Sequence, residues 1–373
     1  MRNSRKKLFM AAFCICLACV WGVIFSGKTM SAMADTVEGT ETVTDPVLDM
    51  TAVTLQKTSV TAYLVPTYSD GKSTYYNYAE ADIMVNSAVV LDEKDGIDLT
   101  CKSSSKKVQV YASLSQNVLH LKLYGNKKCS AKLTIGIAGK IFKVNVNLKP
   151  VKISNQSLLL ERGKTRKLKI AGCSKGIKWS SSNKKIATVS KTGVVKGKKI
   201  GNVVITAKIG SKSVGCAVSV TTGTLKRVCE RATYIGTNWS YSQAKRTQAG
   251  FYDCSSLVWK AYMECAGFSF GNANYPGTSA TEAAWCNANG RMIKGGYSYK
   301  KVKKMQLNPG DIVFKSTDAG NPYNTTYHVE MFTGYICTGY DSKGKPIVSA
   351  LWAARSIGYG AAEGSLLARP LIY

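Results

Sequence analysis

The stretch "IKWSSSNKKIATVSKTGVVKGKKIGNVVITAKIG", residues 177–210, consists of short apolar runs separated by polar turns. Such runs, rich in valine, isoleucine and threonine and bounded by glycine, asparagine and serine, are typical of antiparallel β-strands. Gly193 and Gly201 stand where hairpins require a positive φ. Trp179 offers a large core side chain for a small domain. The stretch therefore predicts a small β-sandwich.

The same alternation of strand and turn continues on both sides, over residues 151–220. Its motifs are Gly163 with its flanking strand, Trp179-Ser180-Ser181-Ser182-Asn183, Ile186-Ala187-Thr188-Val189, Gly193, Gly201 and Ile205-Thr206-Ala207. In these motifs residues 151–220 resemble the bacterial Ig-like group 2 family. The resemblance implies a spacer or surface-adhesion module, not an enzyme.

Residues 51–150 carry a similar but less specific pattern. Runs such as "KKVQVYASL" and "VLHLKLYG" alternate with period two, which predicts half-buried antiparallel strands. Repeated short strands of this kind indicate a further β-sandwich-like module. His120 lies in one of these runs without partners at metal-ligand spacing, and we interpret it as a strand side chain.

The first residues are typical of an export signal. A basic start precedes an apolar run at residues 8–25, and a small-x-small cleavage site at residues 32–34 follows. Residues 1–34 are therefore interpreted as a signal peptide, with two alternatives: a retained membrane anchor, or lipid attachment at Cys19. Residues 35–50 contain acidic but no basic residues and are expected to be a disordered leader. We expect the mature protein to be secreted or associated with the cell wall.

The net charge of +29 is unevenly distributed along the chain. Residues 35–150 hold 13 basic and 12 acidic residues, whereas residues 151–220 hold 16 basic residues and one acidic residue, a balance of +15. A strongly basic field attracts polyanions. For an exported protein this partner is expected to be an anionic cell-wall polymer or acidic lipid, not nucleic acid. The alternative is a surface whose charge serves only solubility.

From residue 224 the pattern changes to helices followed by strands. Helical spacing occurs in "LKRVCERATYIG", "CSSLVWKAYMECAG" and "TSATEAAWCNANG". The expected strands are "DIVFK", "YHVEMFTGY", "PIVSALWAA" and "LLARPLIY". Helices first and an antiparallel sheet second define an α+β plan. The predicted fold class is therefore multidomain: all-β Ig-like sandwich modules, then an α+β domain whose N-terminal helices pack on an antiparallel sheet.

Nine of the 12 cysteines lie outside the predicted signal peptide. Cys101 with Cys129, and Cys173 with Cys216, are candidate disulfide pairs, and the sequence leaves both open. An odd number of cysteines leaves at least one thiol unpaired, and such a thiol is a candidate for reactivity. The spacing of the C-terminal cysteines other than Cys254, which are Cys229, Cys265, Cys286 and Cys337, does not match a zinc site.

Cys254 stands directly at the start of the second expected helix. Unpaired backbone N–H groups and the positive end of the helix dipole favour the thiolate there. His328, the only histidine in residues 224–373, begins a later strand. One cysteine at a helix start and one histidine on a later strand form the general pattern of a Cys-His hydrolase.

Four blocks extend this pattern over most of residues 224–373. They are Tyr241, the segment "YDCSSLV" at 252–258, the segment "LNPGDIVF" at 307–314, and His328-Val329-x-Met331-Phe332-x-Gly334. In these blocks and their order, the region resembles the NlpC-type cysteine peptidases, which are papain-like cell-wall hydrolases of bacteria. The resemblance implies a papain-like α+β fold and no metal or organic cofactor.

The resemblance also implies roles for individual residues. Cys254 matches the nucleophile, His328 matches the base, and Tyr241 matches a tyrosine that donates to the oxyanion, with a packed aromatic ring as the alternative. Asp253 and Ser255 match positions that line the substrate cleft. Their alternatives are capping of the helix for Asp253 and packing in its first turn for Ser255.

Two positions depart from the family pattern. Ser256 stands where the family most often has glycine. The family commonly carries a polar residue, often histidine, on the strand after the base, where it orients the imidazole. Here that strand reads "PIVSALWAA", and the aligned residue is Ser349. A serine hydroxyl or a backbone carbonyl can accept from the imidazole N–H, but less firmly than the usual partner. Either the alignment is off by a few residues, or the imidazole is held differently, or the activity is reduced.

The sequence as a whole predicts an exported peptidoglycan hydrolase. The implied reaction is cleavage of amide bonds in stem peptides, next to D-glutamate, through an acyl-enzyme on Cys254. The alternatives are an N-acetylmuramoyl amidase or an acyl or amide transferase on the same fold, and a wall-binding or adhesion protein of weak or absent activity.

Overall fold

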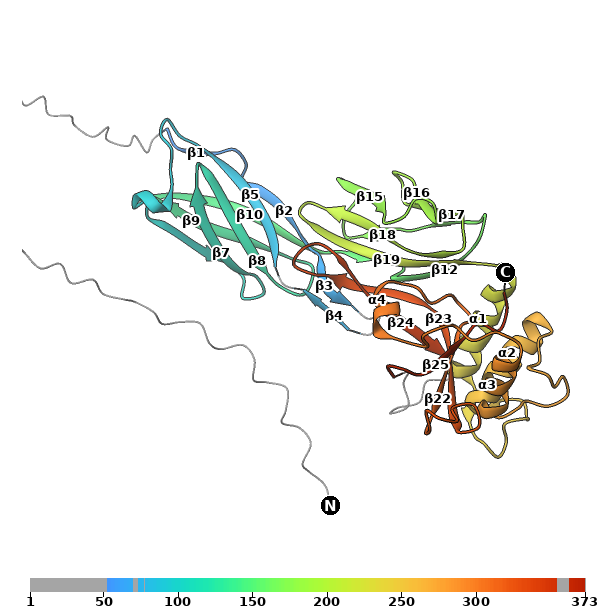
Figure 1. Cartoon of the computed structure of the whole chain (residues 1–373). Coiled ribbons are helices and arrows are strands. Elements are labelled where there is room, and N and C mark those ends of the chain that lie inside the picture. The colour runs from blue at the N-terminus through green and yellow to red at the C-terminus, as the bar shows by residue number, and fades with distance from the viewer. Residues whose placement is uncertain (1–51, 70–72, 77, 354–361, 373) are drawn as a thin grey trace, which may run out of the picture. The chain divides into compact units, whose positions relative to one another are not determined.

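The computed structural model of the chain describes residues 52–69, 73–76, 78–353 and 362–372 (Figure 1). These residues belong to one compact unit, 49–373. The predicted signal peptide and acidic leader lie outside the described residues. Among the helices that are described, none is long and apolar enough to cross a membrane.

The first module is a sandwich of two four-stranded sheets. One sheet has the order β1 (Thr54–Leu55), β5 (Ala79–Asn86), β8 (Val118–Tyr124), β7 (Gln109–Ser115). The other has the order β2 (Ser59–Leu64), β10 (Lys140–Pro150), β9 (Cys129–Ile137), β6 (Leu99–Ser103). A short 3-10 helix, η1 (Glu93–Asp95), precedes β6. Leu119, Leu121 and Leu123 occupy alternate positions of β8 and are fully buried. One face of this strand therefore packs into the core, as the period-two pattern predicts.

A hairpin leaves this sandwich and joins the C-terminal sheet. Strands β3 (Pro66–Ser69) and β4 (Thr74–Tyr76) pair with each other, and Tyr68 pairs with Gly339 of β23. A Cβ at Gly339 would lie 2.2 Å from the carbonyl oxygen of Thr67, so only glycine permits this approach. The sequence analysis assigned residues 51–150 to a single module, which is wrong for this hairpin.

The second module is also a sandwich. Its larger sheet has the order β12 (Ser157–Glu161), β19 (Lys212–Thr221), β18 (Gly201–Ile209), β15 (Ile177–Ser181). Facing strands are β13 (Thr165–Lys167), β17 (Val194–Gly197) and β16 (Ala187–Val189), with the pair β11 (Lys152–Ile153) and β14 (Ile170–Ala171). Trp179 packs against the buried core, and Gly193 has a φ of +82°. Both observations confirm the predicted sandwich.

The C-terminal region combines four described helices with a sheet, as the α+β prediction requires. The helices are α1 (Gly223–Asn238), α2 (Cys254–Ala266), α3 (Ser279–Ala288) and α4 (Tyr299–Lys303). The sheet contains β25 (Leu366–Ala368), β22 (Ile312–Ser316), β23 (Thr326–Tyr340), β3 and β4 in that order, and β24 (Pro346–Ala353) also pairs with β23. Two short strands, β20 (Ser240–Tyr241) and β21 (Phe251–Tyr252), pair just before α2. Apolar side chains of α1, α2 and α3 share one core with those of β22 and β23.

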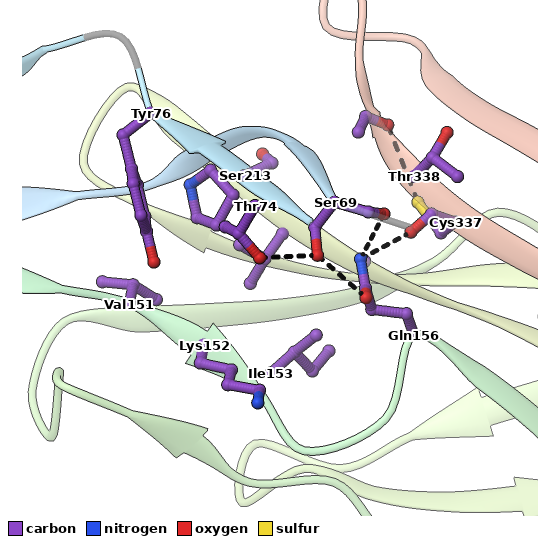
Figure 2. A pocket seen from close by; sticks show the side chains of 14 residues that line it. Ser69, Thr74, Tyr76, Val151, Lys152, Ile153, Gln156, Ser213, Cys337 and Thr338 are labelled. Carbon is purple, nitrogen blue, oxygen red and sulfur yellow. Dashed lines mark hydrogen bonds between the residues drawn. The ribbon is translucent and has the colours of Figure 1, made fainter. Parts of the chain in front are cut away.

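Amide side chains of the second module bind backbone carbonyls of the C-terminal region. Gln156 donates to the carbonyl oxygens of Ser69 (2.8 Å) and Cys337 (3.1 Å), and Figure 2 shows it between them. Asn202 donates to the carbonyl oxygens of Met305 (3.0 Å) and Leu307 (2.7 Å). Because these are buried or half-buried hydrogen bonds, they fix the Ig-like module against the sheet that carries His328.

The nine cysteines in the described residues are free thiols. Cys101 pairs in register with Ile135 of β9, six residues along that strand from Cys129, a separation of about 20 Å. The candidate pair Cys101–Cys129 is therefore wrong. Cys173 and Cys216 are both buried, and no disulfide joins them.

Candidate functional site

Cys254 is the first residue of α2, and a complete capping box precedes it. The carboxylate of Asp253 accepts from the backbone N–H of Ser256 (2.8 Å), and the hydroxyl of Ser256 accepts from the backbone N–H of Asp253 (2.9 Å). This reciprocal pair satisfies two orphan donors of the helix end. It also explains the departure at Ser256, because the serine hydroxyl makes a cap bond that glycine cannot make.

His328 lies on β23 and is in contact with the thiol. His328 is 4% exposed and Cys254 is 6% exposed. Burial lowers the pKa of His328, but a hydrogen bond with Cys254, a nearby carboxylate and the charges of both groups outweigh burial and raise the pKa to about 9. The structure therefore brings together the predicted nucleophile and base from α2 and β23. In this surrounding the imidazole is protonated at neutral pH.

The carboxylate beside the imidazole belongs to Glu330. Its Oε1 lies 3.5 Å from Nε2 of His328. Ser349, which the sequence analysis expected at this position, pairs in register with Ile336 on β23. That register places Ser349 eight residues along the strand from His328, about 26 Å away. The expectation that Ser349 orients the imidazole is therefore wrong.

Tyr241 lies beside the start of α2, where the resemblance placed it. Its ring packs edge to face on Tyr252, with 5.6 Å between the ring centroids, and half of the side chain is exposed. Burial raises the pKa of Tyr241, and the charges of Cys254 and Asp253 raise it further. Hydrogen bonds with Gln243 and with the backbone N–H of Cys254 oppose this increase. The hydroxyl of Tyr241, which the resemblance matches to an oxyanion donor, therefore lies at the backbone N–H of Cys254.

Arg246 binds both residues that were expected to line the substrate cleft. Its Nε lies 3.0 Å from Oδ2 of Asp253, and its Nη2 donates to the hydroxyl of Ser255 (2.9 Å) and to the carbonyl oxygen of Gly277. Asp253 and Ser255 are 5% and 2% exposed. These contacts support the capping and packing alternatives for the two residues. The sequence analysis missed Arg246, whose one signal is its place in the loop before α2.

A second residue that the sequence analysis missed is Glu282, on α3. It is fully buried, and neither carboxylate oxygen has a hydrogen-bond partner among the described residues. Burial raises the pKa of Glu282 well above its usual range, the charge of Cys254 adds to this effect, and Arg246 opposes it. These surroundings favour the neutral form of the Glu282 carboxyl.

Burial raises the pKa of six of the other thiols. It raises the pKa of Cys101 and Cys337 to about 11, and it also raises the pKa of Cys216, Cys229, Cys265 and Cys286. A thiol with a raised pKa is a poor nucleophile at neutral pH. Within the described part of the chain, no three histidine, cysteine or acidic side chains form a group that could hold a metal ion. Cys254 of α2 and His328 of β23 can supply a nucleophile and a proton donor and acceptor, and the N–H of Cys254 and the hydroxyl of Tyr241 on β20 can donate to an oxyanion.

Comparison with known proteins identifies the second module. The family described as "Bacterial Ig-like domain (group 2)" matches residues 147–218, so this part of the chain is a bacterial Ig-like domain. The comparison found no NlpC-type domain. The resemblance of residues 224–373 to that family therefore stays a prediction. No curated protein matches the chain.

Solved structures similar to the chain include several with Ig-like modules. Invasin, a bacterial integrin-binding protein, is 15% identical with a TM-score of 0.25, and the match covers 47% of this chain and 40% of invasin. A C-terminal fragment of intimin is 12% identical with a TM-score of 0.26, covering 84% and 98%. Domains 5–6 of the S-layer protein SbsC are 16% identical with a TM-score of 0.19, covering 48% and 100%. At these sequence identities and TM-scores, the matches support no particular function or partner for this chain.

The contact with His328 predicts which thiol reacts first. With limiting iodoacetamide at neutral pH, we expect Cys254 to be alkylated faster than Cys101 and Cys337, because the imidazolium stabilises its thiolate. Peptide mapping by mass spectrometry measures the order of labelling. The variant His328→Ala should slow the labelling of Cys254 and leave the other rates unchanged. If Cys101, which is more exposed than Cys254, reacts equally fast, the thiolate assignment is wrong.

Proposed function

We propose that residues 224–373 form a cysteine hydrolase domain that cleaves amide bonds in peptidoglycan stem peptides. The observation that carries this proposal is the contact between Cys254, at the positive end of α2, and His328, whose pKa is raised to about 9. This arrangement supports nucleophilic catalysis. The choice of stem peptides, and of the bond next to D-glutamate, rests on the resemblance of the four sequence blocks to NlpC-type peptidases.

The proposed reaction uses each group in turn. The thiolate of Cys254 attacks the amide carbon, and the N–H of Cys254 and the hydroxyl of Tyr241 donate to the resulting oxyanion. The imidazolium of His328 gives its proton to the leaving amine as the carbon–nitrogen bond breaks, which leaves an acyl-enzyme and a neutral imidazole. The imidazole then takes a proton from water, whose oxygen attacks the thioester carbon. The carbon–sulfur bond breaks, which releases the carboxylic acid and restores the thiolate of Cys254 beside the imidazolium.

The other modules are proposed to hold this domain at the cell wall. The sequence pattern of an export signal supports a secreted or wall-associated location. The basic residues of the second module support binding to an anionic wall polymer, because 16 of its 17 charged residues are basic. In this account the Ig-like module concentrates the hydrolase on its polymeric substrate.

A second candidate function is a surface or adhesion protein without catalysis. The match of residues 147–218 to the bacterial Ig-like family favours it. The engagement of Asp253 and Ser255 by Arg246 also favours it, because those side chains are not free to meet a substrate. An amidase or a transferase on the same fold would instead be distinguished by its products, since the bond cleaved and the groups released differ.

Loss of the thiol tests the hydrolase proposal. We expect the full chain to release new amino groups from purified peptidoglycan, and Cys254→Ala to reduce the rate by at least ~10³-fold, because the covalent step is lost. Cys265→Ala on the same helix is the matched control and should keep the rate. If the full chain releases no amino groups, or Cys254→Ala releases as many, the second candidate function stands.

Salt tests the role of the basic module. Retention of the full chain on purified walls should fall with increasing salt, because each lysine contact releases a counterion. Replacing the exposed Lys184, Lys185, Lys198 and Lys199 by glutamine should weaken retention and reduce its salt dependence. The matched control is the same change at four exposed lysines of the first module: Lys106, Lys107, Lys127 and Lys128. Retention that stays the same as the salt concentration increases would contradict an electrostatic attachment.

A further inference from the structure

Glu330 is a buried carboxylate that the expected family pattern does not include. We propose that Glu330 is the positioning residue of this site: it orients the imidazole of His328 and stabilises its protonated form. It would take the place of the polar residue that the sequence analysis sought on the following strand. This inference rests on the proposed function, but its main test does not require catalysis.

The strand itself sets the geometry. His328 and Glu330 are two residues apart on β23, so their side chains point to the same face of the sheet. Oε1 of Glu330 lies 3.5 Å from Nε2 of His328, and the two side chains are 1% and 5% exposed. A charged pair at this distance, removed from water, interacts much more strongly than an exposed pair.

Among the groups around Glu330, the imidazole of His328 is the one that pairs with its carboxylate. Neither of its oxygens has a hydrogen-bond partner among the described residues. The neighbouring buried carboxylate, Asp311, differs: it accepts from Nε (2.7 Å) and Nη2 (2.9 Å) of Arg369 and from the backbone N–H of Asn308 (2.8 Å). Asp311 thus holds the turn before β22 in place. A buried carboxylate without such donors is costly unless a cation compensates its charge, and the imidazolium of His328 is such a cation.

The charged groups around His328 come from several elements. Cys254 faces it from α2, Glu330 from its own strand, and Lys315 lies opposite it in the ladder on β22. Glu282 approaches Cys254 from α3. Cys254 and Glu330 are the groups among these that raise the pKa of His328, whereas Lys315 opposes a second positive charge.

This placement assigns different tasks to the two ring nitrogens. Glu330 accepts the Nε2–H and holds the ring in one orientation. Nδ1 is then the nitrogen that exchanges a proton with the thiol of Cys254 and with the leaving amine. A carboxylate that fixes one imidazole tautomer serves the same purpose in other nucleophilic sites.

The two histidines of the chain make this assignment measurable in the full-length protein. In a ¹⁵N-histidine NMR titration, His328 should lose its proton near pH 9, and His120, which lies 2.8 Å from Asp82 in the first module, is the internal reference. In Glu330→Gln the proton affinity of His328 should fall at least tenfold, because the carboxylate no longer stabilises the cation. Glu330→Asp should restore part of it. His120 should not change in either variant.

Two further variants complete the test. Glu230→Gln, the same change at an exposed residue of α1, should leave the titration of His328 unchanged. Ser349→Ala tests the residue that the family alignment placed beside the imidazole, and it should also leave the titration of His328 unchanged. The inference is overturned if Glu330→Gln does not move the titration of His328, or if Ser349→Ala moves it instead.

The pH dependence of hydrolysis supplies a second readout. The imidazolium is present below its pKa and disappears as the pH rises through about 9, so the rate should decline on the alkaline side near that pH. Glu330→Gln should move this decline to lower pH, whereas a purely structural role would lower the rate at every pH alike. If the full chain has no hydrolase activity, the proposed function fails, and the NMR titration still decides the role of Glu330.

Discussion

The contact between the first residue of α2 and a side chain on β23 is the interaction on which the proposed site depends. It joins a thiol at the positive end of a helix to an imidazole on a sheet. In the proposed site, the helix start and the imidazolium favour the thiolate, and Cys254 and Glu330 favour the imidazolium. Cys254, His328 and Glu330 are all buried. Because water does not compensate a buried charge, the three side chains stabilise one another's charged forms in this account.

The rest of the C-terminal region holds these three side chains in place. The capping box of Asp253 and Ser256 fixes where α2 begins, and Arg246 fixes the capping carboxylate and the neighbouring loop. The strand that carries His328 is long, and the hairpin β3–β4 and amide groups of the Ig-like module contact its far end. The hairpin from the first module and the Ig-like module therefore both stabilise the sheet that carries His328.

The sequence predicted the secondary-structure elements that a local pattern of apolar and polar residues defines. The strands of both sandwiches and the three longer helices follow from periodicity, and Cys254 and His328 follow from their positions at a helix start and a strand start. Three features could not be predicted in this way. The hairpin β3–β4 has an ordinary strand sequence, and only tertiary contact assigns it to another sheet. Ser349 was placed by family alignment, whereas the register of β24 places it far from the imidazole. Glu330 was overlooked because an acidic residue inside an apolar strand has no spacing signature until its partner is located.

The central claim is that Cys254 attacks an amide carbon and carries the acyl group. The direct measurement is the mass of the full chain after brief mixing with soluble peptidoglycan fragments and acid quenching. The account predicts an added mass equal to the acyl half of the fragment, located on the peptide that contains Cys254, because a thioester survives in acid. Release of new amino groups without any adduct on Cys254 would contradict it.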